Sequence, residues 1–123
     1  MSGLQVVWFK RDLRVRDHRA LVEAARSGPV LGLYVFEPSM WRASDAHAGH
    51  LQFVNECLEA MRSSFEARGG RLIRLVGELP DVLERLHALV PVAGLWSHEE
   101  TGNLLSFRRD QRVADWALSL IHI

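Results

Sequence analysis

The sequence predicts an α/β protein, a Rossmann-like doubly wound parallel sheet with helices on both faces. Three observations predict this class. Short apolar runs of strand length alternate with longer stretches whose apolar residues recur at three- and four-residue steps. Glycine or proline separates most of these segments. The length of 123 residues suits a single domain, and strands that alternate with helices form a parallel sheet buried on both sides.

The first three elements are a strand, a helix and a strand. Leu4 to Phe9 is a short run rich in valine and aromatic residues, which predicts a buried strand. Asp17 is placed to cap a helix over about 18–27, and Gly28-Pro29 ends that helix. Val30 to Phe36 then predicts a second buried strand.

A long amphipathic helix follows the longest irregular stretch, Glu37 to His47. We expect this helix over about 48–68, closed by Gly69-Gly70. Its apolar side chains recur on one helical face, which predicts packing against the sheet. They are Leu51, Val54, Leu58, Met61 and Phe65.

The remaining elements repeat the alternation. Leu72 to Val76 predicts the third strand, and a helix is expected to start at Pro80 and to end at Pro91. The buried stripe predicted for that helix consists of Val82, Leu83, Leu86 and Leu89. Val92 to Trp96 predicts the fourth strand, and Asn103 to Ala117 predicts the fourth helix. For this alternation the expected strand order is 3-2-1-4.

The composition indicates the cellular compartment of the protein but does not indicate its function. Basic and acidic residues cancel, 15 against 15, so net charge gives no sign of nucleic-acid binding by this chain alone. The single cysteine cannot form an internal disulfide, which favours a reducing compartment. No segment resembles a signal peptide or reaches the apolar length of a membrane span. We therefore expect a cytoplasmic protein without a membrane partner.

A binding site is expected where the strand order reverses, outside the carboxyl ends of the strands. Here that point lies between strands one and four, where Trp8 to Asp12 faces Ser97 to Asn103, with Glu37 bordering the same region. The loop after the first strand, residues 10–17, contains no glycine. It therefore lacks the close backbone approach that a dinucleotide site or a P-loop requires.

No catalytic or metal-binding constellation is predicted. His47 and His50 have no third ligand placed near them, so we interpret them as surface residues. The run His98-Glu99-Glu100 has neither a nucleophile nor a metal beside it, and it is interpreted as pocket lining or partner contact. The charged residues between Arg11 and Asp17 are expected to form an ion-pair lattice that fixes their loop.

Four segments of the chain resemble, in order, the photolyase and cryptochrome family. The first, Val7-Trp8-Phe9-Lys10-Arg11-Asp12-Leu13-Arg14-Val15-Arg16-Asp17-His18-Arg19-Ala20-Leu21, is similar to the opening signature of that family. The others are Leu31 to Pro38, Phe53 to Leu58, and Leu95 to Asn103 followed by Arg109-Asp110. The resemblance covers residues 4 to about 117. Lys10 stands where the family more usually has arginine, and His18 where it has asparagine.

The resemblance implies the amino-terminal antenna domain of such a protein, truncated before an all-helical domain that holds FAD. Antenna domains often carry a light-harvesting pigment, which is a methenyl-folate, a deazaflavin or a second flavin. In photolyases the excited FAD donates an electron to a pyrimidine dimer in damaged DNA, and in cryptochromes it signals. The expected parent is a deoxyribodipyrimidine photolyase, a carbon–carbon lyase, whereas this chain alone carries no catalytic residue. The alternatives are the same domain of a cryptochrome blue-light receptor, and a free-standing adenosine-nucleotide-binding α/β protein.

Carried over residue by residue, the resemblance also implies pigment contacts. They come from Asn103, with Glu99 and Glu100 beside it, and from Glu37, with Phe36 before it. The spacing from Asn103 to Asp110 is longer than in folate-binding members, so the resemblance does not select one pigment.

The end of the chain departs from the family. Residues 1–117 are expected to form the domain. Residues 118–123 form an apolar tail without a turn residue, where family members turn and begin a fifth strand. We therefore expect the sheet to lack that fifth strand and the tail to mark a truncation.

Overall fold

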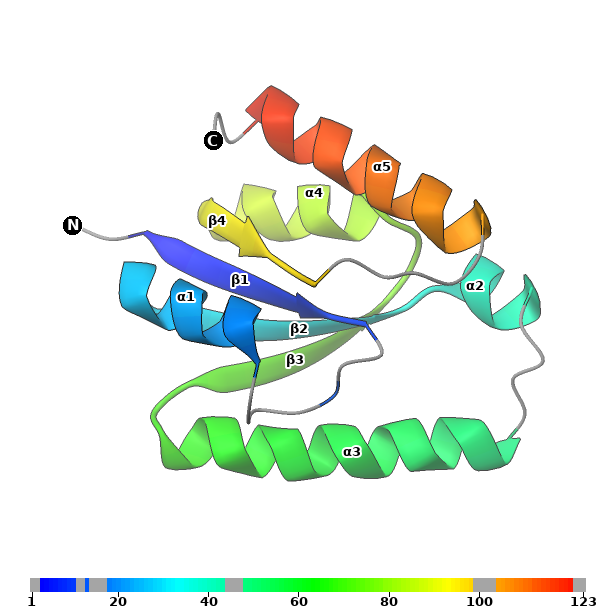
Figure 1. Ribbon diagram of the computed structural model, residues 1–123, viewed down its shortest axis with the longest axis horizontal. Helices are drawn as coiled ribbons and strands as arrows, with labels where there is room; N and C mark the ends of the chain where they lie inside the picture. Colours follow the sequence, from blue (N-terminus) through cyan, green and yellow to red (C-terminus); the bar gives the residue numbers. More distant parts are fainter. Residues whose placement is uncertain (1–2, 11–12, 14–17, 44–47, 99–103, 121–123) are drawn as a thin grey trace.

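A four-stranded parallel sheet lies between two layers of helices (Figure 1). The computed structural model describes residues 3–10, 13, 18–43, 48–98 and 104–120. The strands are β1 Leu4–Phe9, β2 Val30–Phe36, β3 Arg71–Val76 and β4 Val92–Trp96. Their order is β3-β2-β1-β4, which confirms the predicted order.

The helices alternate with the strands, as predicted, with one addition. They are α1 Arg19–Ser27, α2 Pro38–Ala43, α3 Ala48–Ala67, α4 Asp81–Leu89 and α5 Leu104–Leu120. In Figure 1, α3 lies on one side of the sheet, and α4 and α5 lie together on the other. Among the helices described, none is long and apolar enough to cross a membrane.

The central strand β1 is buried on both faces, which explains why its sequence is apolar throughout. Val6 and Trp8 belong to the cluster that packs under α4 and α5. Val7 and Phe9 belong to a second cluster, which includes side chains of α1 and α3. A strand covered on both sides has no solvent-facing positions, and its sequence therefore shows no polar alternation.

Helix α3 packs on the sheet through the face that its periodicity predicts. Val54, Leu58, Met61 and Phe65 are all buried. The helix approaches β2 closely at Gly32, where an added Cβ atom would lie 2.9 Å from Phe65 Cζ. The absence of a side chain at this position in β2 is what admits the Phe65 ring.

Helix α2 was not predicted, and a contact from far along the chain explains it. Its segment falls in the stretch expected to be irregular. The amide and the hydroxyl of Ser39 both donate to the carboxylate of Glu78, at 3.1 and 2.5 Å. Glu78 lies between β3 and α4, so the acceptor for the first turn of α2 is supplied by tertiary structure.

Two local predictions are wrong. His18, not Asp17, caps α1: its Nδ1 accepts a hydrogen bond from the amide of Leu21 at 3.1 Å. Asp17 itself lies outside the described residues. Leu89, placed by periodicity in the buried stripe of α4, is 82% exposed. It is the last residue of its helix, and the chain leaves the sheet-packing surface there.

Candidate functional site

Four charged side chains meet at the carboxyl edge of the sheet. Lys10 follows β1, Glu37 follows β2, and Arg109 and Asp110 lie on α5. Lys10 Nζ lies 3.0 Å from Asp110 Oδ2, and Arg109 Nε donates to Asp110 Oδ1 at 2.8 Å. Arg109 also forms an ion pair with Glu37. We call these four residues the carboxyl-edge network.

The carboxyl-edge network is largely removed from solvent. The side chains of Lys10, Glu37 and Arg109 are 6%, 6% and 5% exposed, and Asp110 is 22% exposed. Two cations and two anions leave no formal net charge. Buried charges of this kind persist only when each is paired and hydrogen-bonded. The network therefore acts as one unit, in which Asp110 joins the two cations.

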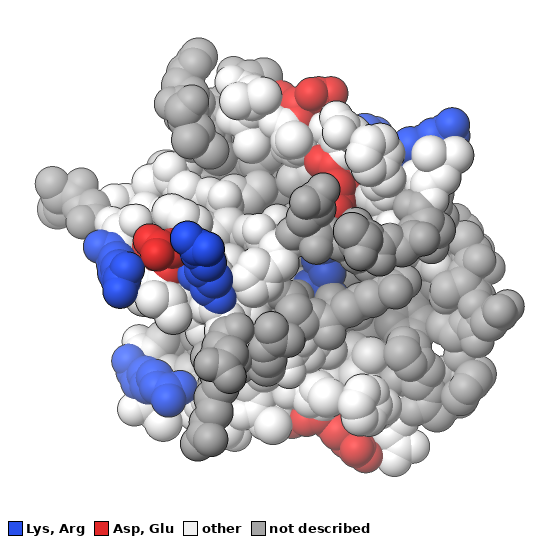
Figure 2. Space-filling model, in the orientation of Figure 1, with Lys and Arg blue, Asp and Glu red and all other residues white. Residues whose placement is uncertain are grey.

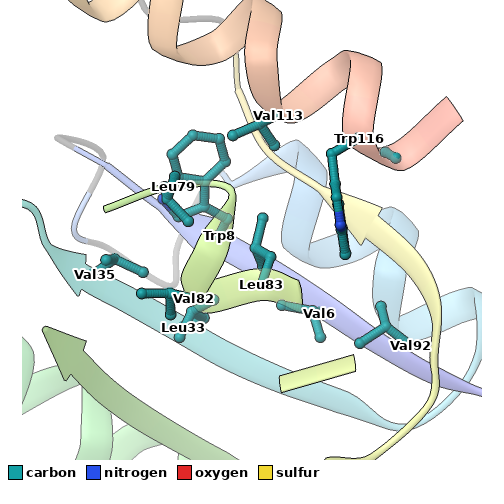
Figure 3. Packing of buried hydrophobic residues seen from close by; sticks show 11 residues of the cluster. Val6, Trp8, Leu33, Val35, Leu79, Val82, Leu83, Val92, Val113 and Trp116 are labelled. Carbon is teal, nitrogen blue, oxygen red and sulfur yellow. The ribbon is translucent and has the colours of Figure 1, made fainter. Parts of the chain in front are cut away.

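The indole of Trp8 lies beneath both cations of the network. Lys10 Nζ is 4.5 Å from the ring centroid, and Arg109 Cζ is 4.9 Å from it. The negative face of an indole attracts cations, and more strongly where water is excluded. Trp8 is 2% exposed and also packs in the core with Leu79 and Val113 (Figure 3). The network is thus continuous with the hydrophobic core.

A second polar cluster lies at the same edge, where β4 ends. The imidazoles of His18 and His98 stack with centroids 4.2 Å apart and an interplanar angle of 28°. His98 Nε2 accepts from the amide of Ala20 at 3.2 Å, next to the bond from Leu21 to His18. The carbonyl of His98 accepts from Lys10 Nζ at 2.7 Å, which links this cluster to the network.

The structure describes two of the five residues expected to contact a pigment. Glu37 is buried in the carboxyl-edge network, and Phe36 is half-buried with its ring 4.8 Å from that of Tyr34. The other three, Glu99, Glu100 and Asn103, lie outside the described residues. The ion-pair lattice expected between Arg11 and Asp17 also falls outside them.

Arg109 belongs to the carboxyl-edge network, but its sequence position alone gave it no role beyond the family resemblance. On α5 the buried positions include Ser106, Arg109, Val113 and Trp116. These positions are three or four residues apart, so Arg109 falls on the apolar stripe of its helix. A charged residue on an apolar helical stripe indicates a buried ion pair, and this was the signal in the sequence. The partner of Arg109, Glu37, could be identified only from the fold.

Charge is mixed elsewhere on the surface. Figure 2 shows basic and acidic side chains interspersed on the face that it draws, among the residues it colours. Within the described part of the chain, no group of three or more His, Cys, Asp or Glu side chains is arranged to hold a metal ion.

Comparison with known proteins gives concordant matches. The family model described as DNA photolyase matches residues 5–119. A deoxyribodipyrimidine photo-lyase of Thermus thermophilus is 36% identical over 117 residues, which cover 92% of this chain and 26% of the relative. A chloroplastic/mitochondrial cryptochrome DASH of Oryza sativa is 33% identical over 108 residues, covering 81% of this chain and 19% of the relative.

A solved structure agrees with these sequence matches. The crystal structure of a class III photolyase from Agrobacterium tumefaciens superimposes with a TM-score of 0.78 at 28% identity. The match covers 94% of this chain and 24% of that protein. The chain therefore spans about a quarter of the length of these photolyases.

The sheet order and the charged carboxyl edge define a Rossmann-like α/β domain with its polar site at the switch point of the strands. The match over residues 5–119 then assigns the family: the chain belongs to the DNA photolyase family.

Proposed function

We propose that this chain is the amino-terminal antenna and scaffold domain of a deoxyribodipyrimidine photolyase. The observation that carries this proposal is the convergence of three family-like segments in the carboxyl-edge network. Lys10 comes from the opening segment, Glu37 from the segment around β2, and Arg109-Asp110 from α5. Residues from three segments that resemble the family thus form one largely buried unit at the edge where ligands of such sheets bind.

The described residues at this edge suit a supporting role toward a pigment. Glu37 is engaged by Arg109, and Asp110 by Lys10 and Arg109. The engaged carboxylate of Glu37 does not fit a direct pigment ligand, so we propose that Glu37 acts by holding Arg109. Direct contacts are proposed for Phe36 and for the residues Glu99, Glu100 and Asn103. A methenyl-folate, deazaflavin or flavin bound there would absorb light for the FAD of the parent protein.

The proposal extends to the rest of the parent protein. FAD would lie in a helical domain that follows this one, and damaged DNA would be the substrate of the whole enzyme. Residues 1–117 would form the antenna domain, with cytoplasmic placement; α5 itself continues to Leu120.

A cryptochrome is the second candidate, because relatives named cryptochrome match the same region as relatives named photolyase. The free-standing nucleotide-binding alternative is not favoured. Lys10, which begins the glycine-free loop, is 6% exposed and bound to Asp110 and His98. It is therefore not presented to a phosphate.

Pigment binding is tested on the purified chain. Methenyl-tetrahydrofolate, a deazaflavin and FMN are each titrated into the protein, and binding is followed by pigment fluorescence. We expect one pigment to bind, and Phe36→Ala to weaken that binding by about tenfold, or 1.4 kcal/mol. Phe53→Ala is the matched control, because Phe53 is 61% exposed on α3. No binding of any pigment, or equal binding by the two variants, would contradict the pigment site.

The choice between photolyase and cryptochrome is tested on the full-length parent. Under blue light, the photolyase reading expects repair of an oligonucleotide that contains a pyrimidine dimer. It expects none from the 123-residue chain alone. A parent that shows light-driven FAD reduction but no repair would favour the cryptochrome, and repair by the isolated chain would contradict the scaffold role.

A further inference from the structure

Helix α5 carries a second stripe of side chains, on the side opposite the one that packs in the core. Its members are all exposed, and they recur at alternating steps of three and four residues. They are Leu104, Phe107, Gln111, Ala114 and Leu118. The three large apolar side chains among them are 60%, 53% and 61% exposed, in chain order. We call these five residues the outer stripe.

The spacing of the outer stripe is that of a helix that pairs with another helix. Alternating steps of three and four residues place its members at the a and d positions of a heptad repeat, which form the seam between paired helices. The opposite side of α5 holds the buried Arg109, Val113 and Trp116, so the outer stripe is turned away from the sheet. The fold thus uses one side of this helix and leaves a pairing seam on the other.

Two exposed charges of opposite sign flank the outer stripe on the same side. Arg108 and Asp115 are seven positions apart, so they occupy the same position of successive heptads. When two copies of a helix pair antiparallel about a two-fold axis, the same flank of both helices meets and the chains run in opposite directions. Arg108 of each copy then faces Asp115 of the other. A parallel pair would instead set Asp115 beside Asp110, a second acid.

The outer stripe is complementary to itself in the register that these two ion pairs require. The layers of an antiparallel pair match an a position with a d position. In this register Phe107 of one copy packs against Leu118 of the other, and Gln111 lies against Ala114. Each contact occurs twice, as it must in an interface where the same surface serves both subunits.

We propose that a second copy of this chain docks on the outer stripe and forms a two-fold dimer with antiparallel α5 helices. The charges and the apolar residues of α5 both point to this occupant, because each matches its own copy in one register. The contact is confined to one helical face, so we expect a weak dimer with a dissociation constant on the order of 100 µM. Exposed ion pairs add little affinity, and Arg108 with Asp115 chiefly selects the orientation. The dimer does not depend on the proposed antenna function.

The test is a charge exchange followed by analytical ultracentrifugation of the purified chain, over about 10 µM to 1 mM. Arg108→Asp and Asp115→Arg each place like charges across both pairs, and each should weaken dimerisation by about tenfold or more. An equal mixture of these two single variants restores opposite charges in both pairs and should dimerise like the wild type. The double variant, Arg108→Asp with Asp115→Arg, should do the same.

Two phenylalanine variants test the apolar seam. Phe107→Ala removes a large side chain from the outer stripe and should weaken dimerisation by about tenfold. Phe53→Ala is the matched control, because Phe53 is also exposed but lies on α3, on the other side of the sheet (Figure 1). It should leave the dissociation constant unchanged. All of these positions are exposed, so the variants should keep the fold.

Three outcomes would overturn the dimer. The wild-type chain could stay monomeric throughout the concentration range, which would leave the outer stripe to a different partner, such as a following domain of the parent protein. Phe53→Ala could weaken association as much as Phe107→Ala, which would place the contact on another face. The mixture of the two charge variants could fail to regain dimers, which would show that Arg108 and Asp115 do not meet across the interface.

Discussion

Arg109 in α5 forms a buried ion pair with Glu37 at the end of β2, a residue 72 positions earlier in the chain. The pair joins α5, which follows β4, to the end of β2, one of the two inner strands of the sheet. Because taking two charges out of water is costly, such a pair contributes little net stability. Its effect is to define the one position of α5 in which both charges are satisfied.

Removing one partner of this pair should be far more damaging than removing both. Glu37→Ala takes from buried Arg109 the carboxylate that pairs with its Nη1, and we expect a loss of about 3–5 kcal/mol in the free energy of unfolding. The double substitution Glu37→Leu with Arg109→Met should cost clearly less, because both buried charges are removed together and Asp110 keeps its ion pair with Lys10. Urea denaturation followed by circular dichroism measures both.

Arg108→Met is the control for this pair, since Arg108 is the exposed neighbour of Arg109 on the same helix. Its effect should stay within about 0.5 kcal/mol. A Glu37→Ala protein as stable as Arg108→Met would show that the pair is not buried as described.

Both the charge and the shape of the Lys10 side chain should contribute to the stability of the protein. Lys10→Met removes the ammonium from Asp110, from the carbonyl of His98 and from the ring of Trp8. Hydrogen bonds to charged groups contribute about 1.5–3 kcal/mol each when a partner is lost, so we expect a loss of at least that size. Lys10→Arg keeps the charge and should lose less. Thermal melting of the two variants side by side decides this, and equal melting temperatures would contradict the charge contacts.

The close approach of α3 to the sheet makes Gly32 sensitive to the smallest substitution. A Cβ atom at this position would lie 2.8 Å from Leu72 Cδ1 and 2.9 Å from Phe65 Cζ. Overpacking of this kind costs about 1–3 kcal/mol, so Gly32→Ala should lower the urea midpoint. Ser63→Ala, at an exposed position of α3, is the control and should leave the midpoint nearly unchanged. A neutral Gly32→Ala would mean that α3 sits further from β2.

The pKa of Glu59 should lie below its ordinary value. Its carboxylate accepts hydrogen bonds from Arg62 first and from Arg74 second, and both favour the charged form. Because the folded pKa is lowered, this contribution to stability is present above the pKa of the unfolded chain and is lost as pH falls through the folded value. The site is exposed, so the effect on stability is small.

The measurement for Glu59 is an NMR titration of its side-chain carboxyl carbon. Arg74→Ala removes one of the two donors and should raise the pKa toward the ordinary value. Arg112→Ala, an exposed arginine on α5, should leave it unchanged. If Arg74→Ala left the titration of Glu59 where it was, the bond between the edge strand β3 and α3 would be absent in solution.

Local patterns along the chain determined most of the secondary structure. All four strands, and the helices α1, α3, α4 and α5, lie where apolar periodicity and glycine or proline punctuation predict them. The exceptions depend on partners distant in sequence. Helix α2 is capped by Glu78, from beyond β3, and no feature of its own segment predicts that contact. Leu89 follows the helical period but lies at the end of α4, beyond the packed surface.

The sequence by itself determined the fold class, the strand order and the edge of the sheet at which polar residues gather, because these follow from the spacing of apolar and charged residues. The segments that resemble the DNA photolyase family were also readable without the fold. Only the tertiary structure decided the partners: Arg109 with Glu37, Lys10 with Asp110, and His98 with His18 and α1. Each of these contacts joins residues from different elements, and their energies depend on burial and distance, which spacing along the chain does not specify.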